Sequence, residues 1–117
     1  MAKYTKHLRG DFTEFLGIVE NELLRGSISA TLEDGSDYEM SGIRCSVRVF
    51  ERYSYWGRNR VSLNLTLFGR ADDFRMTAIT AGGSTAVFLK INTIGEEAFL
   101  DKLVKIVKDY RGTQTYE

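Results

Sequence analysis

The sequence predicts an α+β fold: a two-layer sandwich in which a five-stranded antiparallel meander sheet is covered on one face by an N-terminal and a C-terminal helix. Two segments, near residues 11–26 and 93–110, carry apolar residues at helical spacing. Between them apolar and polar residues alternate with a period of two, which is typical of half-buried strands. The 117 residues suit one domain that buries its core without metals or disulfides.

The N-terminal helix is predicted within "GDFTEFLGIVENELLRG". Asp11 can cap it, and Glu14 stands three residues later, close to the capping-box pattern. Gly26 is placed to end the helix in the left-handed conformation. Residues 1–9, which precede it, are either an edge strand or a loose tail. The apolar stripe consists of Phe12, Phe15, Leu16, Val19 and Leu23.

Five strands are expected next. "SISATLE" and "IRCSVRVFERY" are separated by the turn sequence "DGSD" at 34–37, and "VSLNLTLF", "FRMTAIT" and "AVFLKIN" follow. The predicted inward-facing residues, strand by strand, are Ile28, Ala30 and Leu32; Ile43, Cys45, Val47, Val49 and Tyr53; Val61, Leu63, Leu65 and Leu67; Phe74, Met76 and Ala78; and Val87, Leu89 and Ile91.

Residues that lie opposite one another in antiparallel neighbours share a face, so the loop length restricts the pairing. An odd-length loop between the second and third strands pairs Tyr53 with Val61. A turn at residues 70–71 between the third and fourth pairs Leu67 with Phe74.

The stretch "ITAGGSTAVF" offers two interpretations, a phosphate-binding loop or a tight turn. A phosphate loop needs the pattern G-x-x-x-x-G-K-[ST] before a helix, and here the next lysine is Lys90. A two-residue turn at Gly82–Gly83 pairs Thr80 with Thr85 and supplies the positive φ angles of a hairpin. The hairpin turn is favoured.

The C-terminal helix is predicted within "TIGEEAFLDKLVKIVKDY", where Thr93 and Glu96 have capping-box spacing. Residues 111–117 are expected to form a frayed tail. The apolar stripe of this helix consists of Phe99, Leu103, Ile106, Val107 and Tyr110.

The stretches "GDFTEFL", "VRVFERYSYWG" and "INTIGEEAFLDKL" resemble a domain-of-unknown-function family of small uncharacterised proteins from Gram-positive bacteria, over nearly the whole chain. The resemblance implies a bacterial, single-domain protein with no assigned activity, and it transfers no functional residues. The predicted layout is also similar to helix-grip folds, which enclose a ligand between a curved sheet and a helix, although this chain has fewer strands.

Composition and charge narrow the functional classes. A lone cysteine, Cys45, favours a cytoplasmic setting, and neither a secretion signal nor a membrane-spanning stretch is predicted. The net charge is zero, yet residues 43–70 carry six arginines against one acid, whereas residues 1–42 carry eight acids against four cations. This balance makes nucleic-acid binding unlikely, because such binding depends on neutralising several phosphates.

No catalytic, cofactor or metal site is predicted. His7 is the single histidine, so zinc-ligand spacing is missing. Cys45 is expected to face the core, away from neighbouring arginines that could activate it. Asp72 and Asp73 are adjacent and follow a turn, where solvated acids are common. An enzyme is therefore the least favoured class.

Glu51 and Tyr53 form a candidate pocket rim. Their alternation with Val49 predicts that both face inward, and a buried carboxylate needs a partner. Glu51 therefore lies either at the open rim of the sheet or in a pocket beside a partner such as Arg58.

Arginines interleaved with aromatic residues form the candidate interaction surface, since these residue types are enriched at protein interfaces. The alternatives are a solvated face or an anion-binding face. The candidate residues are Arg44, Arg48, Phe50, Arg52, Tyr55, Trp56, Arg58, Arg60, Phe68 and Arg75.

These patterns predict a non-enzymatic binding or interaction module that forms a homo-oligomer through its sheet face or its aromatic hairpin. The alternative is a carrier of a small apolar or anionic ligand in a pocket between sheet and helices.

Overall fold

The computed structural model describes residues 2–25, 29–53, 60–82, 89–110 and 114–116, and it describes side chains throughout these ranges except in 89–98 and 114–116. The strands are β1 (Ala2–Arg9), β2 (Thr31–Met40), β3 (Ile43–Tyr53), β4 (Arg60–Gly69), β5 (Asp73–Gly82) and the short β6 (Gln114–Tyr116). The helices are α1 (Phe12–Arg25) and α2 (Leu89–Asp109).

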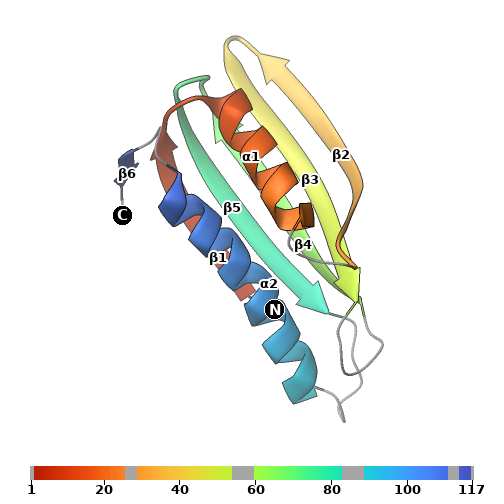
Figure 1. Ribbon diagram of the computed structural model, residues 1–117. Coiled ribbons are helices and arrows are strands. Elements are labelled where there is room, and N and C mark those ends of the chain that lie inside the picture. Colours follow the sequence, from red (N-terminus) through yellow and green to blue (C-terminus); the bar gives the residue numbers. More distant parts are fainter. Residues whose placement is uncertain (1, 26–28, 54–59, 83–88, 111–113, 117) are drawn as a thin grey trace.

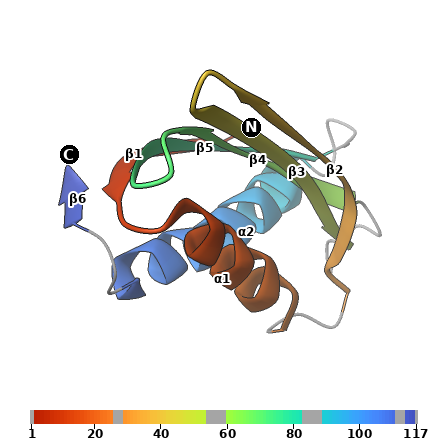
Figure 2. The ribbon, with the colours of Figure 1, turned by 90° about the horizontal axis from the view of Figure 1, so that it is seen from above.

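The strands form one antiparallel sheet in the order β2-β3-β4-β5-β1-β6 (Figure 1). Both helices lie on the same side of this sheet, and the other face carries no described element (Figure 2). The predicted fold class, an α+β sandwich of an antiparallel sheet and two helices, is confirmed, with five long strands in the sheet and the short β6 added at its edge. The two faces of the sheet are called the helix face and the open face below.

Helix α1 begins as the sequence predicts. The Oδ1 atom of Asp11 accepts a hydrogen bond of 2.9 Å from the backbone N–H of Glu14, which satisfies one of the donors left free at a helix start. All five residues of the predicted apolar stripe are buried. Gly26, the predicted end of the helix, lies outside the described residues.

Helix α2 begins at Leu89, before the predicted start, so Thr93 lies within the helix rather than capping it. The predicted stripe of Phe99, Leu103, Ile106, Val107 and Tyr110 is buried. The Tyr110 hydroxyl donates to Glu14 Oε1 (3.1 Å) and accepts from the backbone N–H of Asp11 (3.2 Å). The last turn of α2 is thereby tied to the first turn of α1.

The core fills the layer between the helices and the sheet. Five phenylalanines, Phe12, Phe15, Phe50, Phe74 and Phe99, are almost completely buried there. Phe74 of β5 meets Phe12 edge-on, with ring centroids 5.2 Å apart, and Phe15 at 5.7 Å. Burial of side chains of this size supplies most of the stabilisation of a domain this small.

The first hairpin differs from the prediction, because "DGSD" lies inside β2 and the turn is at Ser41–Gly42. Both turn residues have positive φ, 52° and 81°, which is the geometry of a two-residue hairpin. Gly35 stays in the strand because Arg48 crosses it: a Cβ there would lie 2.7 Å from the Cδ of Arg48. The glycine thus marks a close approach rather than a turn.

The predicted facing of β3 was wrong. The structure pairs Tyr53 with Arg60 and Arg52 with Val61, so the even-numbered residues of β3 share the helix face with the buried leucines of β4. Phe50 and Ser46 are buried there, whereas Cys45 and its odd-numbered neighbours lie on the open face. The error follows from the loop: the connection from Tyr53 to Arg60 contains an even number of residues, and one residue of slip exchanges the two faces.

Strands β4 and β5 bury the predicted residues but in a different register. Leu67 pairs with Met76, not with Phe74, because the turn occupies Ala71–Asp72. This slip of two residues keeps every side chain on its predicted face. The core assignments therefore survive the error in register.

The expected strand at "AVFLKIN" is wrong over residues 89–92, which belong to α2, and residues 86–88 lie outside the described part of the chain. Strand β1 takes its place: Thr80 pairs with Ala2 rather than with Thr85, and Phe74 pairs with Leu8. The predicted hairpin at Gly82–Gly83 is therefore wrong. Of residues 1–9, which the sequence leaves open between an edge strand and a tail, Ala2–Arg9 form β1, and β6 pairs with it at residues 7–9.

The length and hydropathy of the two helices also bear on membrane insertion. Neither helix, over the described residues, combines the length and the apolar character needed to cross a membrane.

Candidate functional site

The residues of the predicted interaction surface are divided between the two faces of the sheet. Arg44, Arg48, Phe50 and Arg52 of β3 lie on the helix face, because that strand has the opposite facing from the prediction. Arg60, Phe68 and Arg75 lie on the open face with the odd-numbered half of β3. Tyr55, Trp56 and Arg58 are outside the described residues. The predicted surface is therefore not one surface.

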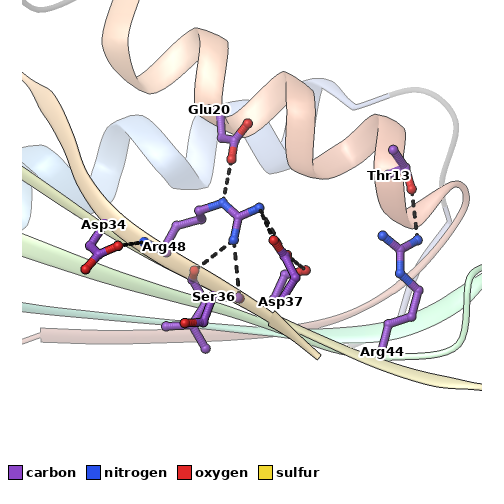
Figure 3. A network of polar contacts seen from close by, with 10 residues as sticks. Thr13, Glu20, Asp34, Ser36, Asp37, Arg44 and Arg48 are labelled. Atoms are coloured by element: carbon purple, nitrogen blue, oxygen red, sulfur yellow. Dashed lines mark hydrogen bonds and ion pairs between the residues drawn. The ribbon is translucent and has the colours of Figure 1, made fainter. Parts of the chain in front are cut away.

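Arg48 is the centre of a polar network between α1 and the sheet (Figure 3). Its Nε donates to Glu20 Oε2 (2.6 Å), its Nη2 to Asp37 Oδ2 (3.2 Å), and its Nη1 to the carbonyl of Val47 (2.9 Å). Only 14% of the side chain is exposed. Burial alone would lower the pKa of Arg48, but the carboxylates of Glu20 and Asp37 outweigh it and raise that pKa. Arg48 thus fastens α1 to β2.

Asp37 is held by a second contact. The hydroxyl of Ser46 donates to its Oδ1 over 2.6 Å, and this bond, together with Arg48, lowers the pKa of Asp37 below its ordinary value of 3.8. Ser46 is itself buried.

Two further arginines stack on aromatic rings of the helices. The Cζ of Arg44 lies 4.2 Å from the ring centroid of Phe12, and its Nη1 donates to Thr13 Oγ1 (2.8 Å). The Cζ of Arg52 lies 4.8 Å from the ring centroid of Phe99. Burial lowers the pKa of Arg52. The arginines of β3 are therefore structural links between the layers, and stacking of this kind is a property of arginine.

The open face carries the opposite kind of side chain. Its strongly exposed large side chains include Tyr38 (67%), Met40 (78%) and Phe68 (54%), which lie close to one another. The odd-numbered residues of β3 beside them are only partly covered. We call the following set the apolar patch: Tyr38, Met40, Ile43, Cys45, Val47, Val49 and Phe68. Contiguous exposed apolar surface of this kind marks interaction sites in soluble proteins.

The register shows that the apolar patch is continuous. Tyr38 lies directly opposite Cys45, and Cys45 lies directly opposite Phe68. The same row continues through Arg75 of β5 to His7 of β1. On one side of this row lies the pair of Met40 and Ile43, and on its other side lies Val47.

Charges flank the apolar patch with opposite signs. On the β1–β5 side of the open face stand Lys3, Arg9 and Arg75, and on the β2 side stand Glu33 and Asp34. Asp34 and Lys3 belong to one row, which runs through Val49, Asn64 and Ile79. The β2–β3 side of the face therefore carries the acids and most of the apolar patch, and the β5–β1 side carries the basic residues.

Glu51 and Tyr53, the predicted pocket rim, lie on the open face and not between sheet and helices. The partner of Glu51 is Arg60, whose Nη2 lies 2.9 Å from the buried Oε1 atom. The ion pair has poor hydrogen-bond alignment, and Arg60 also lies 3.7 Å from Glu33. Tyr53 is 55% exposed and lies beneath the Arg60 guanidinium, 5.4 Å from ring centroid to Cζ.

His7 pairs with Asp73 on the basic side of the open face. The two groups are 2.5 Å apart, and this bond to His7 lowers the pKa of Asp73. A histidine and a carboxylate of this kind can orient a proton transfer only when a nucleophile or substrate atom stands beside the ring. No three metal-ligating side chains gather anywhere in the described parts of the chain.

A groove of about 270 Å³ lies between the two helices, on their outer side. Ile18, Ile106 and Tyr110 contribute apolar surface, and Glu22, Lys102, Lys105 and Asp109 contribute charges. Lys102 donates to the carbonyl of Leu23 at the end of α1 (3.3 Å). Burial and the nearby charge of Arg52 lower the pKa of Lys102.

Sequence reasoning missed Tyr38 and Met40, which it placed outside any strand. Their signal was present, because apolar residues at positions 38, 40, 43, 45, 47 and 49 keep strict alternation across a Ser-Gly turn. The DGSD sequence concealed that signal, since it reads as a turn.

Comparison with known proteins gives one result. No curated protein and no solved structure matches the chain. A family model does, over residues 1–111. The chain therefore belongs to the family of unknown function DUF6054.

Proposed function

We propose that this protein is a non-enzymatic interaction module that self-associates through the open face of its sheet. One observation carries the proposal. The odd-numbered residues of β3 are apolar at alternate positions, as in a strand that buries one face, yet the described chain covers them only partly and leaves Tyr38, Met40 and Phe68 exposed. An antiparallel sheet usually turns its apolar face to the core and its polar face to water, and here arginines occupy the core side of β3.

The charge pattern favours a second copy as the partner. In a two-fold symmetric pair the same patch serves both partners, so it must complement itself. A two-fold axis that runs along the strands, between two facing sheets, places the acidic side of one copy over the basic side of the other. Asp34 then faces Lys3 of its partner copy at both ends of the contact. In the row that contains Phe68, each Phe68 meets the other at the centre, and Cys45 and Tyr38 face Arg75 and His7 of the partner copy.

The main experiment measures the oligomeric state by sedimentation velocity over a range of concentrations. The unmodified protein should show a concentration-dependent dimer. Phe68→Glu should be monomeric at the same concentrations, because burying an unpaired carboxylate in the contact is costly. Its melting temperature should stay near that of the parent, since Phe68 is half exposed. Asn21→Glu on the exposed side of α1 is the matched control and should still dimerise.

A charge exchange tests the orientation. Asp34→Lys and Lys3→Asp should each weaken dimerisation, and the two together should restore it, because the pair is only reversed. A parent protein that stays monomeric at all concentrations would exclude self-association. A dimer that survives Phe68→Glu would place the contact elsewhere.

The carrier hypothesis receives less support. The layer between sheet and helices is filled by large side chains, five of them phenylalanines, and the predicted rim residues Glu51 and Tyr53 lie on the opposite face. The groove between the helices is a separate hollow with acids and bases interspersed, which selects no ligand charge. The bacterial origin and cytoplasmic location stay predictions.

A further inference from the structure

Strand β2 is an unprotected edge. It is ten residues long, every residue is exposed, and the described chain pairs it only with β3. The turn at Ser41–Gly42 makes Met40 and Ile43 the closing pair of a two-residue hairpin, and such a pair exchanges both backbone hydrogen bonds. The backbone groups of Glu39, Asp37 and Gly35 therefore point outward from the sheet, and the N–H of Gly35 donates to Oδ1 of Asp34 (2.8 Å). Such an edge is a template for another strand.

The chemistry of β2 discriminates among strands that could add to it. The strand contains Glu33, Asp34, Asp37 and Glu39 but no lysine, arginine or proline. A second β2 would place acids opposite acids, which destabilises an antiparallel pair. Arg48 neutralises part of the charge of Asp37, but no residue in the described chain forms an ion pair with Glu39. Edge-to-edge pairing of two copies is therefore disfavoured.

The side chains of β2 alternate in character between the two faces. On the helix face lie Gly35, Asp37 and Glu39, and on the open face lie Ser36, Tyr38 and Met40. A strand added to this edge would set alternate side chains beside two carboxylates and the remaining ones beside a tyrosine and a methionine. The register from Asp34 to Met40 is regular, and the irregularity between Leu32 and Asp34 limits the usable edge to about seven residues.

We propose that the β2 edge binds an extended protein segment in which basic and apolar residues alternate, as an additional strand of the sheet. Main-chain hydrogen bonds to the outward N–H and C=O groups of residues 37 and 39, and to the carbonyl of Gly35, hold the segment. Its basic side chains face Asp37 and Glu39, and its apolar side chains pack on Tyr38 and Met40. Binding by strand addition takes affinity from the backbone and specificity from alternate side chains. This inference does not rest on the proposed self-association.

The test uses a fluorescein-labelled seven-residue peptide of alternating valine and arginine, with binding followed by fluorescence anisotropy. Two control peptides have the same composition. One groups the arginines at one end, and the other is methylated at alternate backbone nitrogens. The alternating peptide should bind about tenfold or more tightly than either control, because only it presents both the side-chain pattern and the donors. Equal binding of the three peptides, or no binding, overturns the proposal.

Two variants locate the contact. Glu39→Lys reverses the charge beside the peptide, and Glu39→Pro removes an outward N–H without removing a β2–β3 hydrogen bond. Each should weaken binding about fivefold to tenfold, whereas Glu22→Lys on the helix groove should leave it unchanged. Thermal melts confirm that the variants fold. Unchanged binding in a folded Glu39→Lys protein overturns the proposal.

The Phe68→Glu and Glu39→Pro variants separate peptide binding at the β2 edge from self-association through the open face. Peptide binding should persist in Phe68→Glu, whose substitution lies on β4, away from the β2 edge. A protein dimer that Glu39→Pro dissociates and Phe68→Glu does not would put a second copy on the edge, and would also overturn the proposal.

Discussion

Along β3 the helix face of the sheet carries charged side chains and the open face carries apolar ones, which reverses the usual arrangement. On the helix face stand Arg44, Arg48 and Arg52, each held by a helix residue, whereas the open face carries the apolar patch. Charged groups are tolerated under the helices because each finds a carboxylate, a hydroxyl or a ring. Apolar groups on the open face have no such compensation within the described chain. The helix face therefore stabilises the fold, and the open face is the surface that we propose for self-association.

The largest effect that separates the faces should come from two phenylalanines. Phe50→Ala should lower the free energy of unfolding by about 3–5 kcal/mol, because the ring is fully buried against the helices. Phe68→Ala should change it by no more than about 0.5 kcal/mol in the monomer, as for other exposed sites. Urea unfolding of both variants at low protein concentration measures the difference. Similar losses would mean that the open face is covered.

An intermediate effect should separate two arginines. Arg48→Ala should cost about 1–3 kcal/mol, because it removes the Arg48 donor from the partly buried carboxylate of Glu20 and leaves Asp37 with Ser46 as its side-chain donor. Arg75→Ala on the exposed side of β5 should cost less than about 0.5 kcal/mol. A double-mutant cycle of Arg48 with Glu20 should show positive coupling. If the cycle gives none, the network does not fasten α1 to the sheet.

The smallest expected effect is on the stability of the protein at acidic pH. The pKa of Asp37 is lowered by its bond to Ser46, and that of Asp73 by its bond to His7. A lowered folded-state pKa contributes stability that is present above the ordinary value of 3.8 and is lost as the pH falls below it. The urea midpoint of the parent should fall between pH 5 and pH 3. Asp37→Asn and Asp73→Asn should each make that fall shallower, and parallel curves for all three proteins would contradict the assignment.

The sequence correctly predicted those features that depend on residues close together in the chain. Asp11 capped the predicted helix, and the leucines of β4 alternated onto the predicted face. The facing of β3 could not be found this way, because the parity of one loop decides it and both faces of the strand carry plausible core residues. Arg48 also looked like a surface residue, since its partner Glu20 lies 28 positions away on a helix.

The strand expected at the edge of β5 was decided by which segment pairs with β5, and not by the local preference of the sequence. The alternation at Val87, Leu89 and Ile91 suits a strand that would have completed the β5 edge. That edge is occupied by β1 instead, and Leu89 and Ile91 belong to a helix. A single sequence shows both candidates for the edge but not which one wins. Tertiary context overrides a short local pattern of this kind.

The position of β1 has a consequence for how the chain folds. The Thr80 hydroxyl lies within hydrogen-bond distance of the carbonyl of Ala2, 78 positions earlier, so β1 pairs with a strand that is synthesised long after it. At 5–20 residues per second, β1 waits about 4–16 s on the ribosome for its partner. Non-local pairing of this kind also slows refolding toward the millisecond-to-second range. Strands β2 to β5 can form their hairpins in sequence, and β1 adds to the free edge of β5 only afterwards.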